Sequence, residues 1–251
     1  MRVLSVTHGP TVPGGVFEDA VEAGGHELAR WQVPSAELHA IAQDWDAVMV
    51  FGGSQHPDQD DEFHWLAHEE SFLQEVLAAG VPVFGVCLGS QMLARAAGAT
   101  VGPAREPEIG WLAVSLTPAG EDDPVLGVLP RTATVFQWHH YTFSLPPGAS
   151  ALAESDVCLQ AFRLRDLPAW GIQFHAEVTG AMVSAWIAED PGEEELPMPG
   201  AELREESARR MPQSNAQGRA LAGAFLREAA SRAAPHRAGA TSSPPSSAAG
   251  A

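Results

Sequence analysis

Residues 83–94 read VFGVCLGSQMLA, and the expected fold extends from this stretch in both directions. The apolar run at 83–86 predicts a buried strand, and the residues after Cys87 predict a helix. Gly85 and Gly89 predict a sharp turn between the two, because larger side chains there would collide. The helix would direct free N–H groups and its positive dipole end at the sulfur, which favours the thiolate. We therefore expect a reactive thiol; the alternative is a buried core cysteine, a common place for free thiols.

Alternating strand and helix patterns in the first part of the chain predict an α/β fold with a doubly wound, mostly parallel central sheet flanked by helices. Apolar runs predict strands at 2–8, 26–33 and 46–51, the second of them at an edge. Apolar residues at helical spacing predict a helix over 65–79. After Gly98, Pro and Gly turns separate strand-like segments, which predicts a smaller, partly antiparallel sheet in the second half. Those segments are 109–117, 133–139, 158–165 and 170–175.

The chain divides into three regions by composition. Residues 1–190 are expected to form the main domain. Residues 191–233 are expected to form an acidic linker and two C-terminal helices, at 202–211 and 213–232, that pack on or extend this domain. Residues 234–251 are rich in Ala, Ser and Pro, which predicts a disordered tail.

Bulk composition excludes several classes of protein. The 251 residues are 45% hydrophobic, which is enough for a large core, and the formal net charge of -18 disfavours a nucleic-acid partner. Two cysteines, Cys87 and Cys158, are too few for a disulfide-stapled secreted scaffold. Because neither a signal peptide nor a membrane-spanning run of about 18 apolar residues is apparent, we expect a cytoplasmic protein with no membrane partner.

A nucleophilic cysteine needs a base, and that base needs an orienting acid. His175 ends an apolar strand, at the edge where parallel sheets place their chemistry. Glu177 follows two residues later, on the same face. Cys87, His175 and Glu177 are therefore the predicted catalytic set; the alternative is a surface histidine and glutamate at a strand end. No Cys/His set has metal-ligand spacing, so no metal or other cofactor is expected.

Acyl transfer also needs N–H donors for a developing oxyanion. The N–H of Leu88 is one candidate from the geometry of the turn. The loop Gly52-Gly53-Ser54 can bring backbone N–H groups close to a substrate, because glycine leaves room. A phosphate-binding loop is the weaker alternative, since the loop lacks the Gly-Lys-Ser/Thr and G-x-G-x-x-G patterns.

Segments 51–54, 85–94 and 171–177, in this order, closely resemble the class I (triad) glutamine amidotransferases. Residues 138–146, WHHYTFSLP, resemble the block that this family places between cysteine and histidine. The resemblance covers roughly residues 1–190, which makes that region the catalytic domain. The cysteine turn combined with His-x-Glu is a specific signature.

The resemblance implies a mechanism. Cys87 would attack the side-chain amide of glutamine, His175 would protonate the departing ammonia, and Glu177 would hold His175. A γ-glutamyl thioester would form, and water activated by the same histidine would release glutamate. Leu88 and Gly53 would supply the oxyanion N–H groups.

The resemblance also implies a substrate-binding set, with Gln91 at the position that contacts glutamine in relatives. The other expected members are Gly52, Ser54, His139, His140 and Tyr141; the alternative for the two histidines is packing in the core or exposure to solvent.

Three features depart from the family pattern. Ala176 stands where His-Pro-Glu is commoner, which removes stiffness but keeps the spacing. Tyr141 stands where relatives often have the aspartate of His-Gly-Asp, and tyrosine carries no negative charge at neutral pH. A modified γ-glutamyl substrate therefore becomes an alternative to free glutamine. No synthetase domain is expected within residues 190–251, which are too few and too simple.

Three functions follow from these features. The first is a stand-alone glutaminase, similar to the amidotransferase part of GMP synthetase, that passes ammonia to a separate synthetase partner. The second is a γ-glutamyl hydrolase acting alone on a peptide or amine conjugate. The third is a non-catalytic regulatory protein, which an intact Cys/His/Glu set disfavours. An α/β-hydrolase is also disfavoured, because its acid precedes its histidine in sequence whereas Glu177 follows His175.

Overall fold

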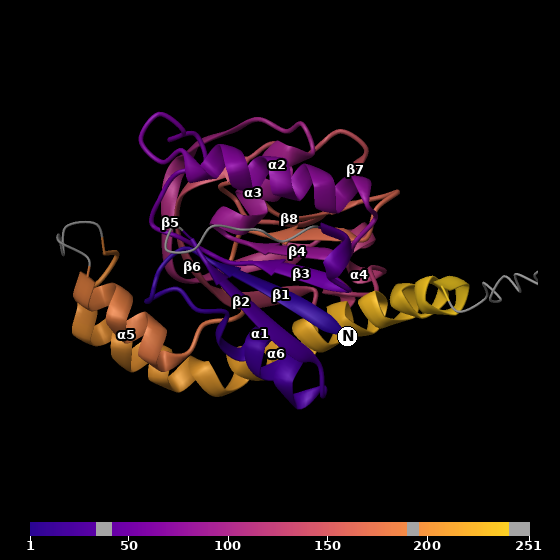
Figure 1. Ribbon diagram of the computed structural model, residues 1–251. Coiled ribbons are helices and arrows are strands. Elements are labelled where there is room, and N and C mark those ends of the chain that lie inside the picture. Colours follow the sequence, from indigo (N-terminus) through magenta and orange to yellow (C-terminus); the bar gives the residue numbers. More distant parts are fainter. Residues whose placement is uncertain (34–41, 190–195, 241–251) are drawn as a thin grey trace, which may run out of the picture.

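The computed structural model describes residues 1–33, 42–189 and 196–240, and its described strands form one mixed, curled sheet with helices on both faces (Figure 1). The strand order is β2-β1-β3-β4-β9-β8-β7-β5-β6. Neighbouring strands are parallel from β2 to β9 and antiparallel from β9 to β6. The strands are β1 (Arg2–Thr7), β2 (Glu27–Gln32), β3 (Ala47–Val50), β4 (Val83–Val86), β5 (Val101–Leu116), β6 (Thr132–Phe143), β7 (Ala149–Glu154), β8 (Leu159–Leu164) and β9 (Ala169–Ile172).

The predicted α/β class, with a parallel first half and an antiparallel second half, is confirmed. The antiparallel strands continue the main sheet rather than forming a smaller sheet of their own, because β9 pairs with β4 on one side and β8 on the other. The edge position expected for β2 is also confirmed.

Helices cover the sheet from both sides, which explains the uninterrupted apolar sequence of the central strands. Along β3, Ala47 and Met49 pack under α1 (Gly15–Ala23) and α6 (Gly200–Ala240), whereas Val48 and Val50 pack under α2 (Trp65–Ala78) and α3 (Leu88–Ala96). Successive side chains of a strand point to opposite faces, so a strand buried on both faces must be apolar throughout. The remaining helical elements are η1 (Ala42–Asp44), α4 (Pro118–Glu121), η2 (Leu126–Val128) and α5 (Gly180–Glu189).

The C-terminal region differs from the expectation of two helices. One helix, α6, runs from Gly200 to Ala240 and contains Pro212. Leu203 before the proline and Phe225 after it are buried in separate apolar clusters. Packing on both sides therefore compensates for the loss of the backbone hydrogen bond that proline cannot make. Residues 234–240, which were expected to be disordered, form the last part of this helix. The rest of the predicted tail, 241–251, and the acidic residues 190–195 lie outside the described residues.

Strand β7 was not predicted from sequence. Its residues, ASALAE, include neither aromatic nor β-branched side chains, so its strand propensity is low. Pairing with β8 and β5 forms it instead. None of the helices in the described ranges is long and apolar enough to cross a membrane.

Candidate active site

Cys87 occupies the turn between β4 and α3 in a strained backbone conformation. Its φ of 51° and ψ of -113° make it the one non-glycine residue with positive φ within the described ranges. Hydrogen bonds hold this backbone on both sides: the Cys87 N–H donates to the Ile172 carbonyl (2.9 Å), and the Gln91 N–H donates to the Cys87 carbonyl (3.0 Å). Strain of this kind is characteristic of functional sites and persists only where the surroundings enforce it. The predicted strand, turn and helix are confirmed.

The two glycines around the cysteine are sterically required. A Cβ on Gly85 would lie 2.6 Å from the carbonyl oxygen of Gly89. A Cβ on Gly89 would overlap the carbonyl oxygen of Val50. Both clashes involve backbone atoms, which cannot rotate away, so the turn can bring α3 this close to the sheet only with glycine.

His175 and Glu177 form a buried pair after β9. His175 Nδ1 lies 2.7 Å from Glu177 Oε1, and their side chains are 4% and 2% exposed. The backbone N–H of His175 donates to the Phe136 carbonyl of β6 (2.8 Å), and the Trp186 ring packs edge-on against the imidazole. The carboxylate and the indole therefore hold the imidazole ring, and the backbone hydrogen bond holds the main chain that carries it.

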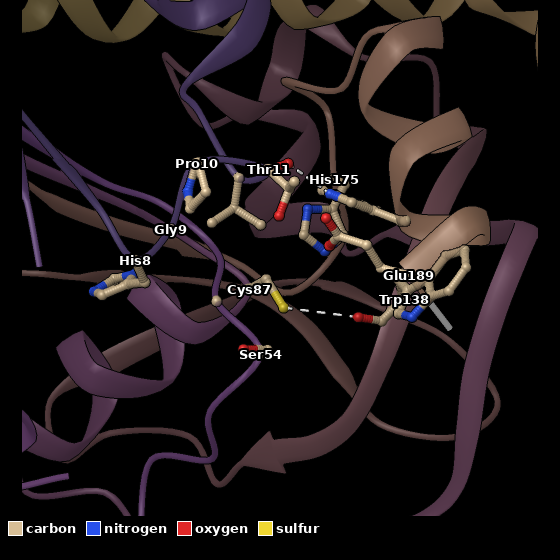
Figure 2. A pocket seen from close by; sticks show the side chains of 12 residues that line it. His8, Gly9, Pro10, Thr11, Ser54, Cys87, Trp138, His175 and Glu189 are labelled. Carbon is tan, nitrogen blue, oxygen red and sulfur yellow. Dashed lines mark hydrogen bonds between the residues drawn. The ribbon is translucent and has the colours of Figure 1, made fainter. Parts of the chain in front are cut away.

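The His175 pair adjoins the thiol. A Cβ on Gly52 would lie 3.1 Å from His175 Cε1 and 3.7 Å from Cys87 Cβ, so one glycine touches both side chains. Burial alone would lower the pKa of His175, but the Glu177 carboxylate and Cys87 together raise it to about 10. Because Glu177 occupies Nδ1, Nε2 is the nitrogen left to face the thiol (Figure 2).

A pocket of about 380 Å³ opens above these groups (Figure 2). It brings together four residues singled out from sequence: Gly53, Ser54, Cys87 and His175. Sequence reasoning did not identify the remaining lining residues, which are His8, Gly9, Pro10, Thr11, Val12, Trp138, Trp186 and Glu189.

Gln91 does not line this pocket, although the resemblance implied a contact with substrate. It is 3% exposed, and its amide nitrogen donates to the Tyr141 carbonyl (2.9 Å) and to Gln173 Oε1 (3.1 Å). Gln173, which sequence reasoning missed, is fully buried and places its own Nε2 3.7 Å from Cys87 Sγ. A glutamine two residues before His175 would face the same way as His175 on an extended strand, a signal that could have identified it.

Four further predicted substrate contacts also lie outside the pocket lining: Gly52, His139, His140 and Tyr141. Alternation along β6 turns Trp138 toward the pocket and His139 to the opposite face. There His139 Nδ1 lies 3.0 Å from the Tyr141 carbonyl, and Nε2 lies 3.2 Å from Glu108 Oε2. The Tyr141 ring stacks on His56, with centroids 3.9 Å apart. His140 is likewise absent from the lining.

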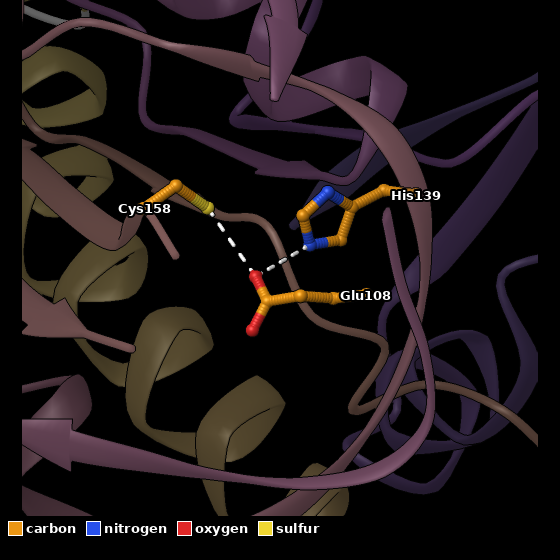
Figure 3. Close-up of side chains that lie close together, drawn as sticks. All are labelled: Glu108, His139 and Cys158. Atoms are coloured by element: carbon orange, nitrogen blue, oxygen red, sulfur yellow. Dashed lines mark hydrogen bonds and ion pairs between the residues drawn. The ribbon is translucent and has the colours of Figure 1, made fainter. Parts of the chain in front are cut away.

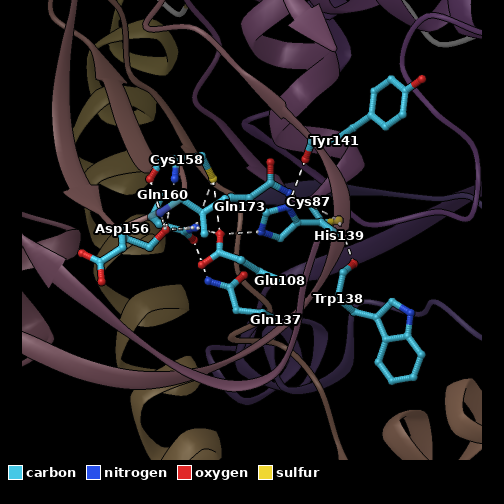
Figure 4. A network of polar contacts seen from close by, with 12 residues as sticks. Cys87, Glu108, Gln137, Trp138, His139, Tyr141, Asp156, Cys158, Gln160 and Gln173 are labelled. Carbon is cyan, nitrogen blue, oxygen red and sulfur yellow. Dashed lines mark hydrogen bonds and ion pairs between the residues drawn. The ribbon is translucent and has the colours of Figure 1, made fainter. Parts of the chain in front are cut away.

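Glu108, His139 and Cys158 form a second cluster on that opposite face (Figure 3), and their polar atoms all lie within 4.8 Å of one another. This spacing would suit a metal ion. However, Gln160 Nε2 donates to Glu108 Oε2 (2.7 Å) and lies 3.3 Å from Cys158 Sγ, so N–H groups already point at two of the three atoms. The cluster is better described as one end of a polar network that reaches Cys87 through Gln173 and Gln91 (Figure 4).

Comparisons with known proteins show the family to which this chain belongs. The family model "Glutamine amidotransferase class-I" matches residues 17–188. A putative glutamine amidotransferase-like protein of Salmonella typhimurium, YfeJ, is 31% identical over 191 residues, which cover 74% of this chain and 80% of that protein. A glutamine-hydrolyzing GMP synthase component from Archaeoglobus fulgidus is 36% identical over 138 residues, or 54% of this chain and 68% of that protein.

Solved structures show the same likeness. The crystal structure of a glutamine amidotransferase from Thermotoga maritima has a TM-score of 0.81 and 28% identity, and the match covers 90% of this chain and 98% of that one. A glutamine amidotransferase from Methylobacillus flagellatus also gives a TM-score of 0.81, with 27% identity over 90% of this chain and 94% of that one. The chain belongs to the class-I glutamine amidotransferase family, and this membership identifies it as an enzyme of the amidotransferase type.

Proposed function

We propose that the protein hydrolyses the side-chain amide of glutamine through a cysteinyl γ-glutamyl thioester, with Cys87 as nucleophile, His175 as acid and base, and Glu177 as its orienting group. The buried His175–Glu177 pair beside Cys87 is the observation that carries this proposal. A histidine whose pKa is raised to about 10 by a carboxylate and a sulfur is protonated at neutral pH, so a proton is available for the leaving nitrogen.

The reaction proceeds in two steps. Cys87 Sγ attacks the amide carbon, the C–N bond breaks, and His175 Nε2 gives its proton to the departing ammonia. His175 then removes a proton from water, the hydroxide attacks the thioester carbon, and the C–S bond breaks to release glutamate. Glutamine and water are consumed, and glutamate and ammonia are formed.

Backbone N–H groups would stabilise the oxyanion of each tetrahedral intermediate. Leu88 is the first residue of α3, and the N–H groups of a helix's first turn lack intrahelical partners. Gly53 lies in the pocket lining beside Cys87. These two residues are the proposed oxyanion donors, and Gly52 and Ser54 complete the loop against the substrate.

A second candidate function is hydrolysis of a larger γ-glutamyl peptide or amine. Two observations favour it: Tyr141 stacks on His56 rather than placing a carboxylate in the pocket, and Trp138 and Trp186 line the pocket as broad apolar surfaces. Both candidates share the same thioester chemistry and differ only in the leaving amine.

If glutamine is the substrate, we propose that the ammonia passes to a separate synthetase partner in the cytoplasm. The names of the GMP synthase relatives support such a partner, although the match spans only 57% of the Pyrococcus abyssi protein. The free thiols of Cys87 and Cys158 support a reducing compartment.

The decisive experiment incubates the protein with glutamine and with a panel of γ-glutamyl peptides and amines, and measures the released ammonia or amine. Cys87→Ala should abolish release, and Cys158→Ser, the matched control, should leave it unchanged. Mass spectrometry of a rapidly quenched reaction should detect a γ-glutamyl adduct on Cys87. Release that survives Cys87→Ala would refute the mechanism.

A further inference from the structure

A second buried histidine–carboxylate pair lies behind the glycine loop and has no role in the proposed triad. His8 follows β1, and its Nε2 lies 2.7 Å from Oε2 of Glu69 in α2. Both side chains are fully buried. Glu69 Oε1 has no hydrogen-bond partner within the described part of the chain. Removing two such groups from water costs about as much as their attraction returns, so stability alone is a weak explanation for the pair.

The other nitrogen of His8 contacts the glycine loop. His8 Nδ1 lies 3.0 Å from the carbonyl oxygen of Gly52, and the ring stacks on Trp65 at a centroid distance of 5.2 Å. A carbonyl oxygen can only accept, so Nδ1 must carry a hydrogen and donate it. Burial lowers the pKa of His8, but the Glu69 carboxylate and the loop carbonyls outweigh burial and raise it. Glu69 therefore helps to keep the imidazole in a donating form.

This contact fixes the direction of the next N–H group. A trans peptide is planar, so the Gly53 N–H points opposite to the Gly52 carbonyl. Two successive glycines form the most freely rotating backbone available, and without a restraint this peptide could turn over. With its carbonyl held by His8, the Gly53 N–H is directed away from His8, and Gly52 itself lies against His175 and Cys87.

We propose that His8 and Glu69 are positioning residues for the oxyanion hole: they lock the Gly52–Gly53 peptide so that the Gly53 N–H stays aimed at the developing oxyanion. This inference rests on the proposed function, because only a reaction with an oxyanion needs the hole. A donor fixed in place before the reaction stabilises charge without a reorganisation cost, which is where such sites gain most of their rate.

The sequence carries a signal for each of these two residues. His8 stands at the carboxyl end of a parallel strand, where such sheets place their chemistry. Glu69 is a buried acid on the apolar face of α2, between Leu66 and Phe72.

The test compares His8→Leu, His8→Asn, Glu69→Gln and the control Glu75→Gln, which removes an exposed charge from the same helix. Two rates are measured for each variant: kcat and KM on the best substrate of the panel, and alkylation of Cys87 by iodoacetamide. Alkylation displaces iodide at carbon and forms no oxyanion, so it reports the intact thiol site but not the hole.

For His8→Leu we expect kcat to fall at least 10-fold. Complete loss of one oxyanion donor lowers kcat by about 10²–10³-fold, and this sets the largest effect that we expect. KM and the alkylation rate should stay within about 3-fold of wild type, because the thiol and the rest of the pocket lining remain. His8→Asn places an amide N–H near the position of Nδ1 and should recover most of the loss. Glu69→Gln should give an intermediate loss, and Glu75→Gln none.

The inference fails if His8→Leu keeps the wild-type kcat, or if kcat and the alkylation rate fall together, which would indicate general distortion of the site. Failure of the proposed function looks different: hydrolysis would then survive Cys87→Ala in the wild-type background.

Discussion

His175 Nδ1 and Glu177 Oε1 lie 2.7 Å apart with both side chains almost fully buried, and Gly52 lies against both His175 and Cys87. The three side chains come from two strand ends that are neighbours in the sheet, since β4 pairs with β9. The parallel register therefore builds the proposed triad from segments almost ninety residues apart.

Removing the charge of Glu177 tests this pair. In Glu177→Gln the shape of the pair is kept, but the imidazole loses the carboxylate that raises its pKa. We expect kcat to fall by roughly 10²- to 10⁴-fold with a small change in KM. Ammonia release measures the effect, and Glu154→Gln, an exposed acid in β7, is the matched control. Unchanged kcat in Glu177→Gln would remove Glu177 from the mechanism.

The two cysteines should differ in reactivity. Burial raises the pKa of Cys158 to about 11, so only about one molecule in 10⁴ has a Cys158 thiolate at pH 7. Cys87 instead sits beside a protonated imidazole at a helix N-terminus. Limiting iodoacetamide followed by peptide mapping should therefore find the label on Cys87 and almost none on Cys158. Faster labelling of Cys158 would contradict the assignment of Cys87 as the nucleophile.

The His175 pair should stabilise the fold in a pH-dependent way. Its folded-state pKa, about 10, is above the ordinary value of 6.5, so the folded protein binds the extra proton between these limits. The stabilisation is complete below about pH 6.5 and is lost as the pH rises through about 10. The difference in unfolding free energy between wild type and His175→Gln should thus shrink from pH 6.5 to pH 10. A difference that stays constant over most of this range would show that the histidine is already neutral in the folded state.

The turn around Cys87 should not tolerate a methyl group at Gly89. A Cβ there overlaps the Val50 carbonyl, whereas a Cβ on Gly102 has no atom within 4 Å. We expect Gly89→Ala to reduce the free energy of unfolding by about 1–3 kcal/mol, and Gly102→Ala to change it by less than about 0.5 kcal/mol. Urea denaturation measures both. Equal stability of the two variants would show that α3 can shift away from β3.

Several features were predictable because they depend on neighbours in sequence. The turn at Cys87 is encoded by its flanking glycines, and the buried strand β3 by its continuous apolar residues. The approach of His175 to Glu177 follows from their two-residue spacing.

Other features depend on contacts between distant segments. Gln91 was expected in the pocket, but its amide donates to Gln173, which lies 82 positions away in the sequence. Strand β7 exists through its pairing partners rather than its own propensity, and α6 continues through Pro212 because apolar clusters hold both sides.

By itself, the sequence determined the α/β class, the strained cysteine turn and the order of the proposed catalytic groups, since each of these depends on residues that are close together in the sequence. Only the tertiary structure decided which polar side chains surround the thiol and which turn away from it. It placed His8 and Glu69 behind Gly52, and His139 on the far face of β6 beside Glu108. The physical reason is that a hydrogen bond forms only between groups that are close in space. The order of strands in the sheet sets which groups are close, and that order depends on the whole chain.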